Sequence, residues 1–184
     1  MNAAVMSHLA AIPATATTAA RADFEQIVRE HSAMVFSIAW HYLHDRALAE
    51  EVAQDVFLQL HRDLDRVEDA GHVKHWLRRV ATHRCIDQVR ARKTRAQVAL
   101  EDAPPLAAVE READPLMSRL LQRLVASLPP QARMMIVLRY QEEMDPMEIA
   151  ETLGIPARTV RTRLHRALHL LREKAARQQR EVNS

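Results

Sequence analysis

Side chains that could read DNA recur along one face of residues 157–173. Arginine donates two parallel hydrogen bonds to the edge of guanine, and threonine reaches phosphates or base edges. Apolar residues with helical spacing (Val160, Leu164, Leu168 and Leu171) form the opposite face. We therefore expect an amphipathic helix whose polar face enters the major groove through six candidate contacts, Arg158, Thr159, Arg161, Thr162, His165 and Arg166.

A shorter helix is expected over residues 145–153, so that the two helices form a helix-turn-helix. Gly154 and Pro156 separate them, because glycine tolerates a left-handed turn and proline cannot continue a helix. Ala150, Gly154 and Val160 fall where a close crossing of two helices needs small or buried residues. A basic amphipathic helix alone is often an ordinary solvated surface. The positions of Ala150, Gly154 and Val160 beside the arginines favour a DNA-binding helix-turn-helix instead.

A second basic segment lies in the first half of the chain, where residues 72–95 hold eight Lys/Arg and one acidic residue. We expect a loop over residues 65–72, which contains Gly71, and then a helix over residues 73–92, with His72, Lys74 and His75 where the loop meets the helix. Its exposed side could contact a DNA strand while the loop holds an unstacked base. Alternatively, Trp76 is simply a core residue and the basic side of the helix is an ordinary solvated face that binds no DNA. The candidate contacts are His72, Lys74, Trp76, Arg79, His83 and Arg84.

The helix expected over residues 46–64 carries acidic and amide groups beside its apolar stripe. Asp45 is a candidate cap for its start. Carboxylates repel DNA and suit a basic protein partner, although a solubilising face is the alternative. The candidate partner contacts from this face are Glu51, Gln54 and Asp55.

The composition favours helix throughout. Only two of the 184 residues are glycine and 48% are hydrophobic, which predicts an all-α fold with real cores. Acidic and basic segments alternate, as expected of a protein that touches a polyanion at two places. The single cysteine, Cys85, predicts a buried thiol in a reducing cytoplasm. The sequence has no catalytic constellation, no Gly-rich phosphate loop and no compelling metal spacing among its ten histidines, so we expect no enzyme, no cofactor and no metal.

Two small helical domains joined by a flexible acidic linker are the expected architecture, with the helix-turn-helix in the second domain. We expect a disordered tail over residues 1–20, the first domain over 21–95, the linker over 96–115, the second domain over 116–176 and a short tail over 177–184. Pro104, Pro105 and five acidic residues over 101–114 mark the linker. No apolar run reaches the roughly 20 residues that span a bilayer, and no Lys or Arg precedes Arg21 as in a signal peptide, so we expect no membrane insertion.

Four motifs in order resemble the extracytoplasmic-function sigma factors, the two-domain class of bacterial sigma factors. AEEVAQDVFLQL (49–60) resembles their polymerase-binding helix, and HVKHWLRRVATHRCIDQVRARK (72–93) resembles the segment that melts and reads the −10 element. LPPQARMMIVLRYQEEMDPMEIAETLGI (128–155) and PARTVRTRLHRALHLLRE (156–173) resemble the −35-binding domain and its recognition helix. The order of the four motifs is more specific than any one of them.

The resemblance implies a promoter-specificity subunit of RNA polymerase. Glu51, Gln54 and Asp55 would dock on the clamp helices of the largest polymerase subunit, and the second domain would meet the flap of the second-largest. Residues near His72 to Lys74 would hold a flipped base of the −10 element, whereas residues 158–166 would read the −35 element. Members of the family are usually held by an anti-sigma factor, so such a partner is also implied. His83 stands where many relatives carry asparagine, so the base preference at −10 is left open.

Two other functions remain as alternatives from the residues themselves. A stand-alone helix-turn-helix regulator would explain residues 145–173 but would leave the basic helix 73–92 and the acidic helix 46–64 without a role. In a helical adaptor that binds only protein, mutation of the arginines of residues 158–166 would have no effect on function. Duplex binding without polymerase would distinguish the regulator, and mutation of Arg161 and Arg166 would distinguish the adaptor.

Overall fold

The computed structural model describes residues 18–63, 70–98 and 115–182 of the chain. Their regular structure is entirely helical, which confirms the all-α class. The helices are α2 (Thr18–Leu43), α3 (Arg46–Asp63), α4 (Ala70–Val98), α5 (Pro115–Ala126), α6 (Pro130–Tyr140), α7 (Pro146–Leu153) and α8 (Ala157–Val182).

Helices α2, α3 and α4 pack against one another as the first unit. Their apolar residues recur at helical spacing, so each helix buries one stripe, represented by Ile38 on α2, Val56 on α3 and Leu77 on α4. Asp45 caps α3, because its Oδ1 accepts a hydrogen bond from the backbone N–H of Leu48 at 3.1 Å. This cap confirms the role expected for Asp45 and separates α2 from α3 within two residues.

Helices α5 to α8 form the second unit, in which α6 and α7 pack on α8. Pro130 begins α6, where a missing N–H costs nothing. Asp145 and Pro146 begin α7, and Gly154 ends it in the left-handed conformation at φ 64° and ψ 37°. The helix-turn-helix expected from the sequence therefore forms at the expected residues.

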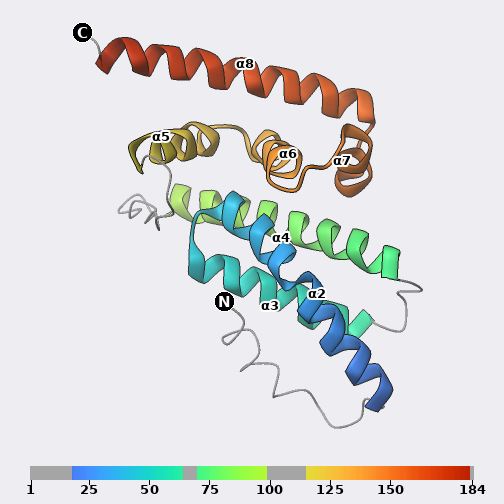
Figure 1. The fold of residues 1–184 in the computed structure, drawn as a ribbon. Helices are drawn as coiled ribbons and strands as arrows, with labels where there is room; N and C mark the ends of the chain where they lie inside the picture. Colours follow the sequence, from blue (N-terminus) through green and yellow to red (C-terminus); the bar gives the residue numbers. More distant parts are fainter. Residues whose placement is uncertain (1–17, 64–69, 99–114, 183–184) are drawn as a thin grey trace.

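The two units share one hydrophobic core. Figure 1 shows α6 and α7 lying between α8 and α4, and both of them contact α4. Tyr42 of α2 is fully buried at this junction and donates a hydrogen bond from Oη to the carbonyl of Pro130 at 3.2 Å. The guanidinium of Arg133 lies 5.4 Å from the centre of the same ring, and Ser37 Oγ donates to Glu142 at 2.8 Å. The junction thus combines apolar burial with specific polar contacts.

Several helices extend beyond the residues expected from the sequence. Helix α2 begins at Thr18, inside the expected tail, and α8 continues to Val182, through most of the expected C-terminal tail. Helix α4 begins at Ala70, so the expected loop ending at residue 72 is wrong for its last residues. Most of the N-terminal tail and of the linker, residues 1–17 and 99–114, lies outside the described residues.

Candidate nucleic-acid interface

The long helix α8 separates an apolar face from a basic one. Val160, Leu164 and Ala167 are buried against the second unit. Five of the six candidate contacts on the other face are exposed, and Thr159 is half-buried. The exposed contacts are Arg158, Arg161, Thr162, His165 and Arg166. The residues expected to meet a DNA groove therefore share one accessible face, as the periodicity predicts.

The start of α7 is fixed by a reciprocal pair of hydrogen bonds. Asp145 Oδ1 accepts from the N–H groups of Met147 at 2.6 Å and Glu148 at 3.0 Å, while Glu148 Oε2 accepts from Asp145 N–H at 2.8 Å. These backbone bonds, first that of Glu148 and then that of Met147, hold the pKa of Asp145 below its usual value. The entry to the helix-turn-helix is thus anchored on an ionised carboxylate.

The turn between α7 and α8 closes through backbone hydrogen bonds around Gly154. Ile155 N–H donates to the carbonyl of Ala150 at 3.0 Å, and Gly154 N–H donates to that of Glu151 at 3.3 Å. This pairing satisfies carbonyls that the end of α7 would leave open, and it needs a left-handed residue at the turn. It orients the first turn of α8, where Arg158 and Arg161 begin the basic face.

The first turns of α4 carry the residues expected to lie in a loop. His72 and Lys74 are exposed, and both belong to the helix rather than to a loop before it. Trp76 is half-buried and packs against the core, so the internal position considered for it is partly realised. A base held at this end would therefore meet a helix start and its side chains rather than a flexible loop.

The middle of α4 brings its candidate contacts to different neighbours. Arg79 and His83 are exposed on successive turns, and His83 Nδ1 lies 2.7 Å from the carbonyl oxygen of Arg79. Arg84 turns toward α3 instead, where its guanidinium lies 3.6 Å from Asp55 and donates to Gln59 at 3.2 Å. One side chain expected to meet DNA and one expected to meet polymerase thus form an ion pair.

The acidic face of α3 is accessible as expected. Glu51 and Asp55 are exposed and Gln54 is half-buried. Leu58 lies one turn further along the same face and leaves 40% of its surface exposed. Leu58 was not among the residues expected on this face, although its spacing of three and seven residues from Asp55 and Glu51 indicates the same face. An exposed apolar side chain here could be buried by a protein partner, with the polar groups around it at the rim of the contact.

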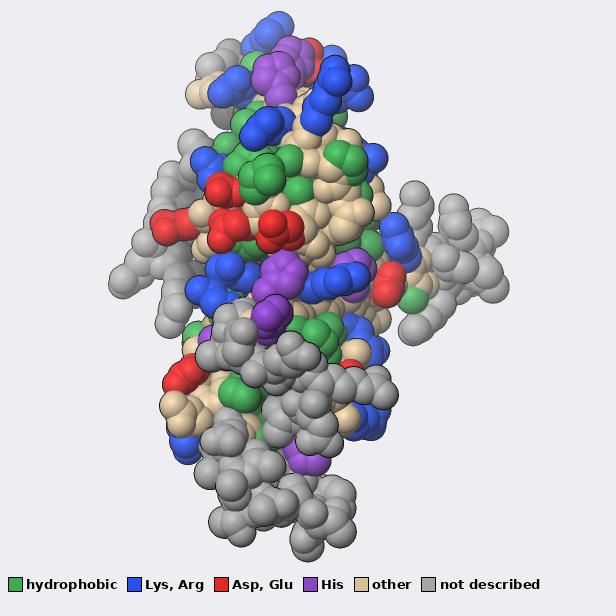
Figure 2. Space-filling model, turned by 90° about the vertical axis from the view of Figure 1, so that its right-hand side faces the viewer, with side chains coloured by type: hydrophobic (Ala, Val, Ile, Leu, Met, Phe, Trp, Pro, Cys, Tyr) green, Lys and Arg blue, Asp and Glu red, His purple; other side chains and the backbone are tan. Residues whose placement is uncertain are grey.

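His83 also faces the second unit. It lines a small cavity of about 200 Å³ together with Gln131 and Met135 of α6 and with Leu153 and Ile155 at the turn after α7. The helix-turn-helix therefore lies beside the middle of α4. Figure 2 shows the consequence at the surface: basic and histidine side chains gather over α8 and again over α4, and acidic side chains lie between them, over α7.

Other chemistry finds little support in the part of the chain that the structure describes. No group of three or more His, Cys, Asp or Glu residues is placed to hold a metal ion within those ranges. Cys85 is fully buried, and burial raises its pKa to about 12, as expected of an internal thiol. Among the described helices, none is both long and apolar enough to cross a bilayer.

Both units match families of bacterial sigma factors. Residues 27–95 match Sigma-70 region 2, and residues 118–171 match Sigma-70, region 4. The chain is 32% identical over 179 residues to the ECF RNA polymerase sigma factor SigE of Mycolicibacterium smegmatis, a comparison that covers 94% of this chain and 69% of that protein. It is 32% identical over 153 residues to the RNA polymerase sigma-E factor of Streptomyces coelicolor, covering 82% and 85%.

The chain therefore belongs to the extracytoplasmic-function sigma factors. It is a transcription initiation factor that recognises promoters and directs RNA polymerase to them, rather than a stand-alone regulator.

Two solved structures share the fold. The first is the sigma factor RpoE in complex with the anti-sigma factor NepR from Bartonella quintana, with a TM-score of 0.70, 20% identity, and coverage of 82% of this chain and 95% of that one. The second is CnrH in complex with the cytosolic domain of CnrY, with a TM-score of 0.63, 21% identity, and coverage of 85% and 89%.

Proposed function

We propose that three surfaces divide the work of promoter recognition: the acidic face of α3 binds polymerase, the basic side of α4 takes the −10 strand, and the basic face of α8 reads the −35 duplex. The observation that carries this division is that the candidate contacts on α3 and α8 lie on separate accessible faces of opposite charge. We place the first domain at residues 21–95, the linker at 96–115 and the second domain at 116–176, with tails at 1–20 and 177–184.

At the −35 element, the first turns of α8 enter the major groove. Arg161, Thr162, His165 and Arg166 meet base edges, and Arg158 with Thr159 meets phosphates. Thr162 Oγ1 already donates to the carbonyl of Arg158 at 3.0 Å, so its hydroxyl oxygen is left to accept a hydrogen bond from a base. A bidentate arginine–guanine pair is worth about 1–3 kcal/mol of discrimination.

At the −10 element, the start of α4 holds an unstacked base and its middle follows the strand. His72, Lys74 and Trp76 lie at the base, and Arg79, His83 and Arg84 lie along the backbone. The amino end of a helix favours negative charge, which suits a phosphate beside Lys74. Unstacking costs about a few kcal/mol, which these contacts offset.

At the polymerase, Glu51, Gln54 and Asp55 dock on the clamp helices of the largest subunit, and Leu58 adds apolar burial. The second domain meets the flap of the second-largest subunit. The chain performs no covalent chemistry and needs no cofactor or metal, because the polymerase makes the RNA. A chain with these partners would act in the cytoplasm, where the bacterial polymerase and its DNA are.

An anti-sigma factor is the expected regulator. The two solved structures that share this fold are both complexes: RpoE is bound to the anti-sigma factor NepR, and CnrH is bound to the cytosolic domain of CnrY. A partner that covers the acidic face of α3 would exclude polymerase, since the same side chains would be used twice.

Run-off transcription tests this function directly. Core polymerase is incubated with a pool of random promoters, with and without the chain, and the transcripts are sequenced. We expect chain-dependent initiation downstream of a shared two-part element. Arg172→Ala, an exposed change on α8 outside the candidate set, is the matched control and should leave the element unchanged. Tight duplex binding without polymerase, together with no initiation, would contradict the proposal.

A further inference from the structure

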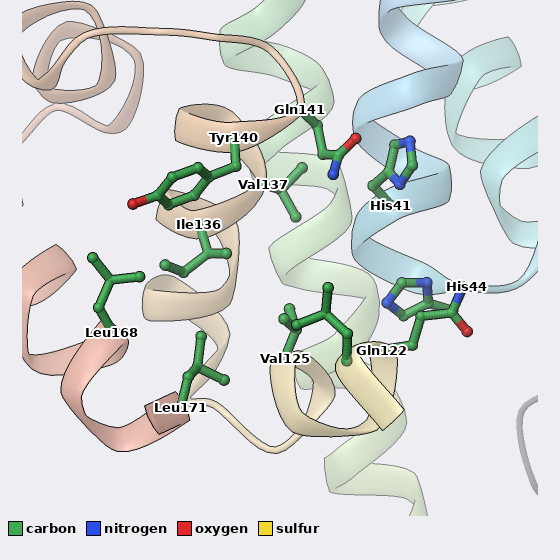
Figure 3. Close-up of a pocket in the computed structure, with 11 residues that line it drawn as sticks. His41, His44, Gln122, Val125, Ile136, Val137, Tyr140, Gln141, Leu168 and Leu171 are labelled. Carbon is green, nitrogen blue, oxygen red and sulfur yellow. The ribbon is translucent and has the colours of Figure 1, made fainter. Parts of the chain in front are cut away.

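A cavity of about 460 Å³ lies where the end of α2 meets the second unit. Figure 3 shows it opening between His41 of α2, His44 just beyond the end of α2, and the side chains of α5, α6 and α8. Most of the lining is apolar, and the polar groups are confined to a few positions. The lining residues are His41, His44, Leu121, Gln122, Val125, Ile136, Val137, Tyr140, Gln141, Leu168 and Leu171.

His44 is the most constrained of these residues. It follows the last residue of α2 in the left-handed conformation at φ 52°, and its N–H donates to the carbonyl of Trp40 at 2.9 Å. Its Nε2 is shielded from solvent and makes no hydrogen bond within the described part of the chain. Such an imidazole tolerates the neutral form, whereas a second proton would place an unpaired charge in an apolar wall.

The neighbouring charges oppose protonation as well. Burial, then Arg133 of α6 and then His41 lower the pKa of His44 to about 4. The cavity residues from α5 and α8 are uncharged, and those from α6 include only Tyr140 as a titratable group. Asp45, the next residue in the chain, is already engaged by Leu48 N–H and by Arg92 at 3.4 Å. The carbonyl end of α2 favours a cation by up to about 1.5 pKa units, which is smaller than the lowering of the His44 pKa from 6.5 to about 4.

We propose that the junction between the two units is an acid-released latch, in which protonation of His44 separates α5 and α6 from the end of α2. The positive charge of Arg133 disfavours protonation of His44 while the junction is closed. The Arg133 guanidinium lies over the ring of Tyr42 across the junction, and it donates a hydrogen bond to the carbonyl of Ala126 within its own unit. Protonated His44 would be a second positive charge beside Arg133. Water that enters when α6 moves away from the end of α2 would screen this repulsion.

The direction of the pH dependence follows from linkage. With the units together His44 has its pKa near 4, and with them apart it returns toward the ordinary value of 6.5. The closed junction is thus fully stable above about pH 6.5 and loses stability as the pH falls toward 4. From pH 7.5 to 5.5 the equilibrium constant for closure should fall about tenfold from His44 alone. The pKa of His41 is lowered by burial too, so it adds to the effect in the same direction.

Energy transfer between dyes on the two units tests the latch in the full-length chain. Arg62→Cys on α3 and Ala176→Cys on α8 provide exposed attachment sites, and the native Cys85 is buried. Transfer and far-ultraviolet circular dichroism are recorded from pH 7.5 to 5.5, above the range in which most carboxylates titrate. We expect the mean transfer efficiency to fall while helix content stays constant. Unchanged transfer, or a parallel loss of helix content, would overturn the latch.

Two substitutions assign the response to its residue. His44→Asn removes the titration, and asparagine tolerates the left-handed conformation; we expect the response to shrink to the smaller part left by His41. His169→Gln, on the exposed face of α8, is the matched control and should behave as the unaltered chain does. A full response in His44→Asn would refute the assignment. If that variant does not fold, NMR of the His44 ring in the unaltered chain gives the test. Titration of His44 near pH 6.5 would refute the latch, and a ring that stays neutral down to pH 5 in the closed molecules would support it.

Discussion

Arg166 lies exposed on α8, one helical turn beyond Thr162, where a recognition helix would reach a base edge. We expect Arg166→Ala to cost about 1–3 kcal/mol of discrimination at one position of the −35 element. Competition between promoter variants for the polymerase complex measures this loss. Arg172→Ala should leave discrimination intact; if Arg166→Ala instead weakened binding to every promoter variant equally, Arg166 would be a phosphate contact.

Asp55 belongs to the polymerase-binding face proposed on α3, so Asp55→Ala should weaken polymerase binding without changing promoter preference. A loss of about 1–2 kcal/mol is expected for a contributing interface residue. Fluorescence anisotropy with labelled core polymerase measures the affinity, and transcript sequencing measures the preference. Asp87→Ala, an exposed acidic change on α4, serves as the control. Unaltered affinity combined with altered promoter choice would reverse the role given to Asp55.

For single residues, the sequence predicts which side chains are exposed but not which other side chains they contact. Helical periodicity was enough to place Arg161 and His165 on one exposed face and Val160 on the buried one. The ion pair between Arg84 and Asp55 could not be found in this way. It depends on how α3 and α4 cross, and residues 29 positions apart carry no periodic signal of their contact.

The turn between α7 and α8 depends on one backbone conformation. Gly154 has φ 64°, and an added Cβ would meet no atom within 4 Å. Gly154→Ala should therefore destabilise the second unit only through its backbone, by about 1–2 kcal/mol. Chemical denaturation followed by circular dichroism measures the cost. Gly154→Asn should cost less, since asparagine adopts the left-handed conformation more readily; a larger loss would reveal a steric contact instead.

The ends of the helices were predicted well where the sequence carries a capping or breaking residue. Asp45, Asp145 and Gly154 mark boundaries that the structure has within a residue or so. Helix α8 runs past the expected end because residues 174–182 contain good helix formers and no breaker. The start of α4 lies at Ala70 rather than at residue 73 because Gly71, which favours a loop in the sequence, is accommodated in the first turn of the helix.

The packing of the two units on each other is the feature that the sequence did not reveal. It rests on contacts between distant residues, such as Tyr42 with Pro130 and Ser37 with Glu142. The apolar stripes of α2, α4 and α6 predict that each helix is buried somewhere, but not which unit covers it. The candidate surfaces were therefore predictable one by one, whereas their arrangement was not.

This arrangement predicts a large change of shape in the initiation complex. Helices α4 and α8 lie one helix layer apart, and axes in contact are about 8–10 Å apart, so they are separated by roughly 20 Å. Two promoter elements about two turns of DNA apart are separated by about 70 Å at about 34 Å per turn. The two units must separate to bind both elements.

Energy transfer between Arg62→Cys and Ala176→Cys measures this separation at neutral pH. We expect high transfer for the free chain and low transfer once core polymerase and promoter DNA are added. Polymerase with DNA that lacks both elements is the control for docking alone. If transfer stayed high in a complex that makes RNA, the junction would have to persist during initiation, and the surfaces assigned to α4 and α8 could not both be correct.

The buried thiol of Cys85 has a kinetic consequence. Reagents such as maleimides react with a thiolate, and this one is fully covered with its pKa raised to about 12. Modification must therefore wait for α4 to lift from α2 and α3. The rate of labelling therefore measures the transient opening of the first unit. At high reagent concentration it equals the opening rate, and at low concentration it depends on the opening equilibrium. The Cys85 sulfur thus reports the local lifetime of the core beneath the surfaces proposed to bind the −10 strand and the polymerase.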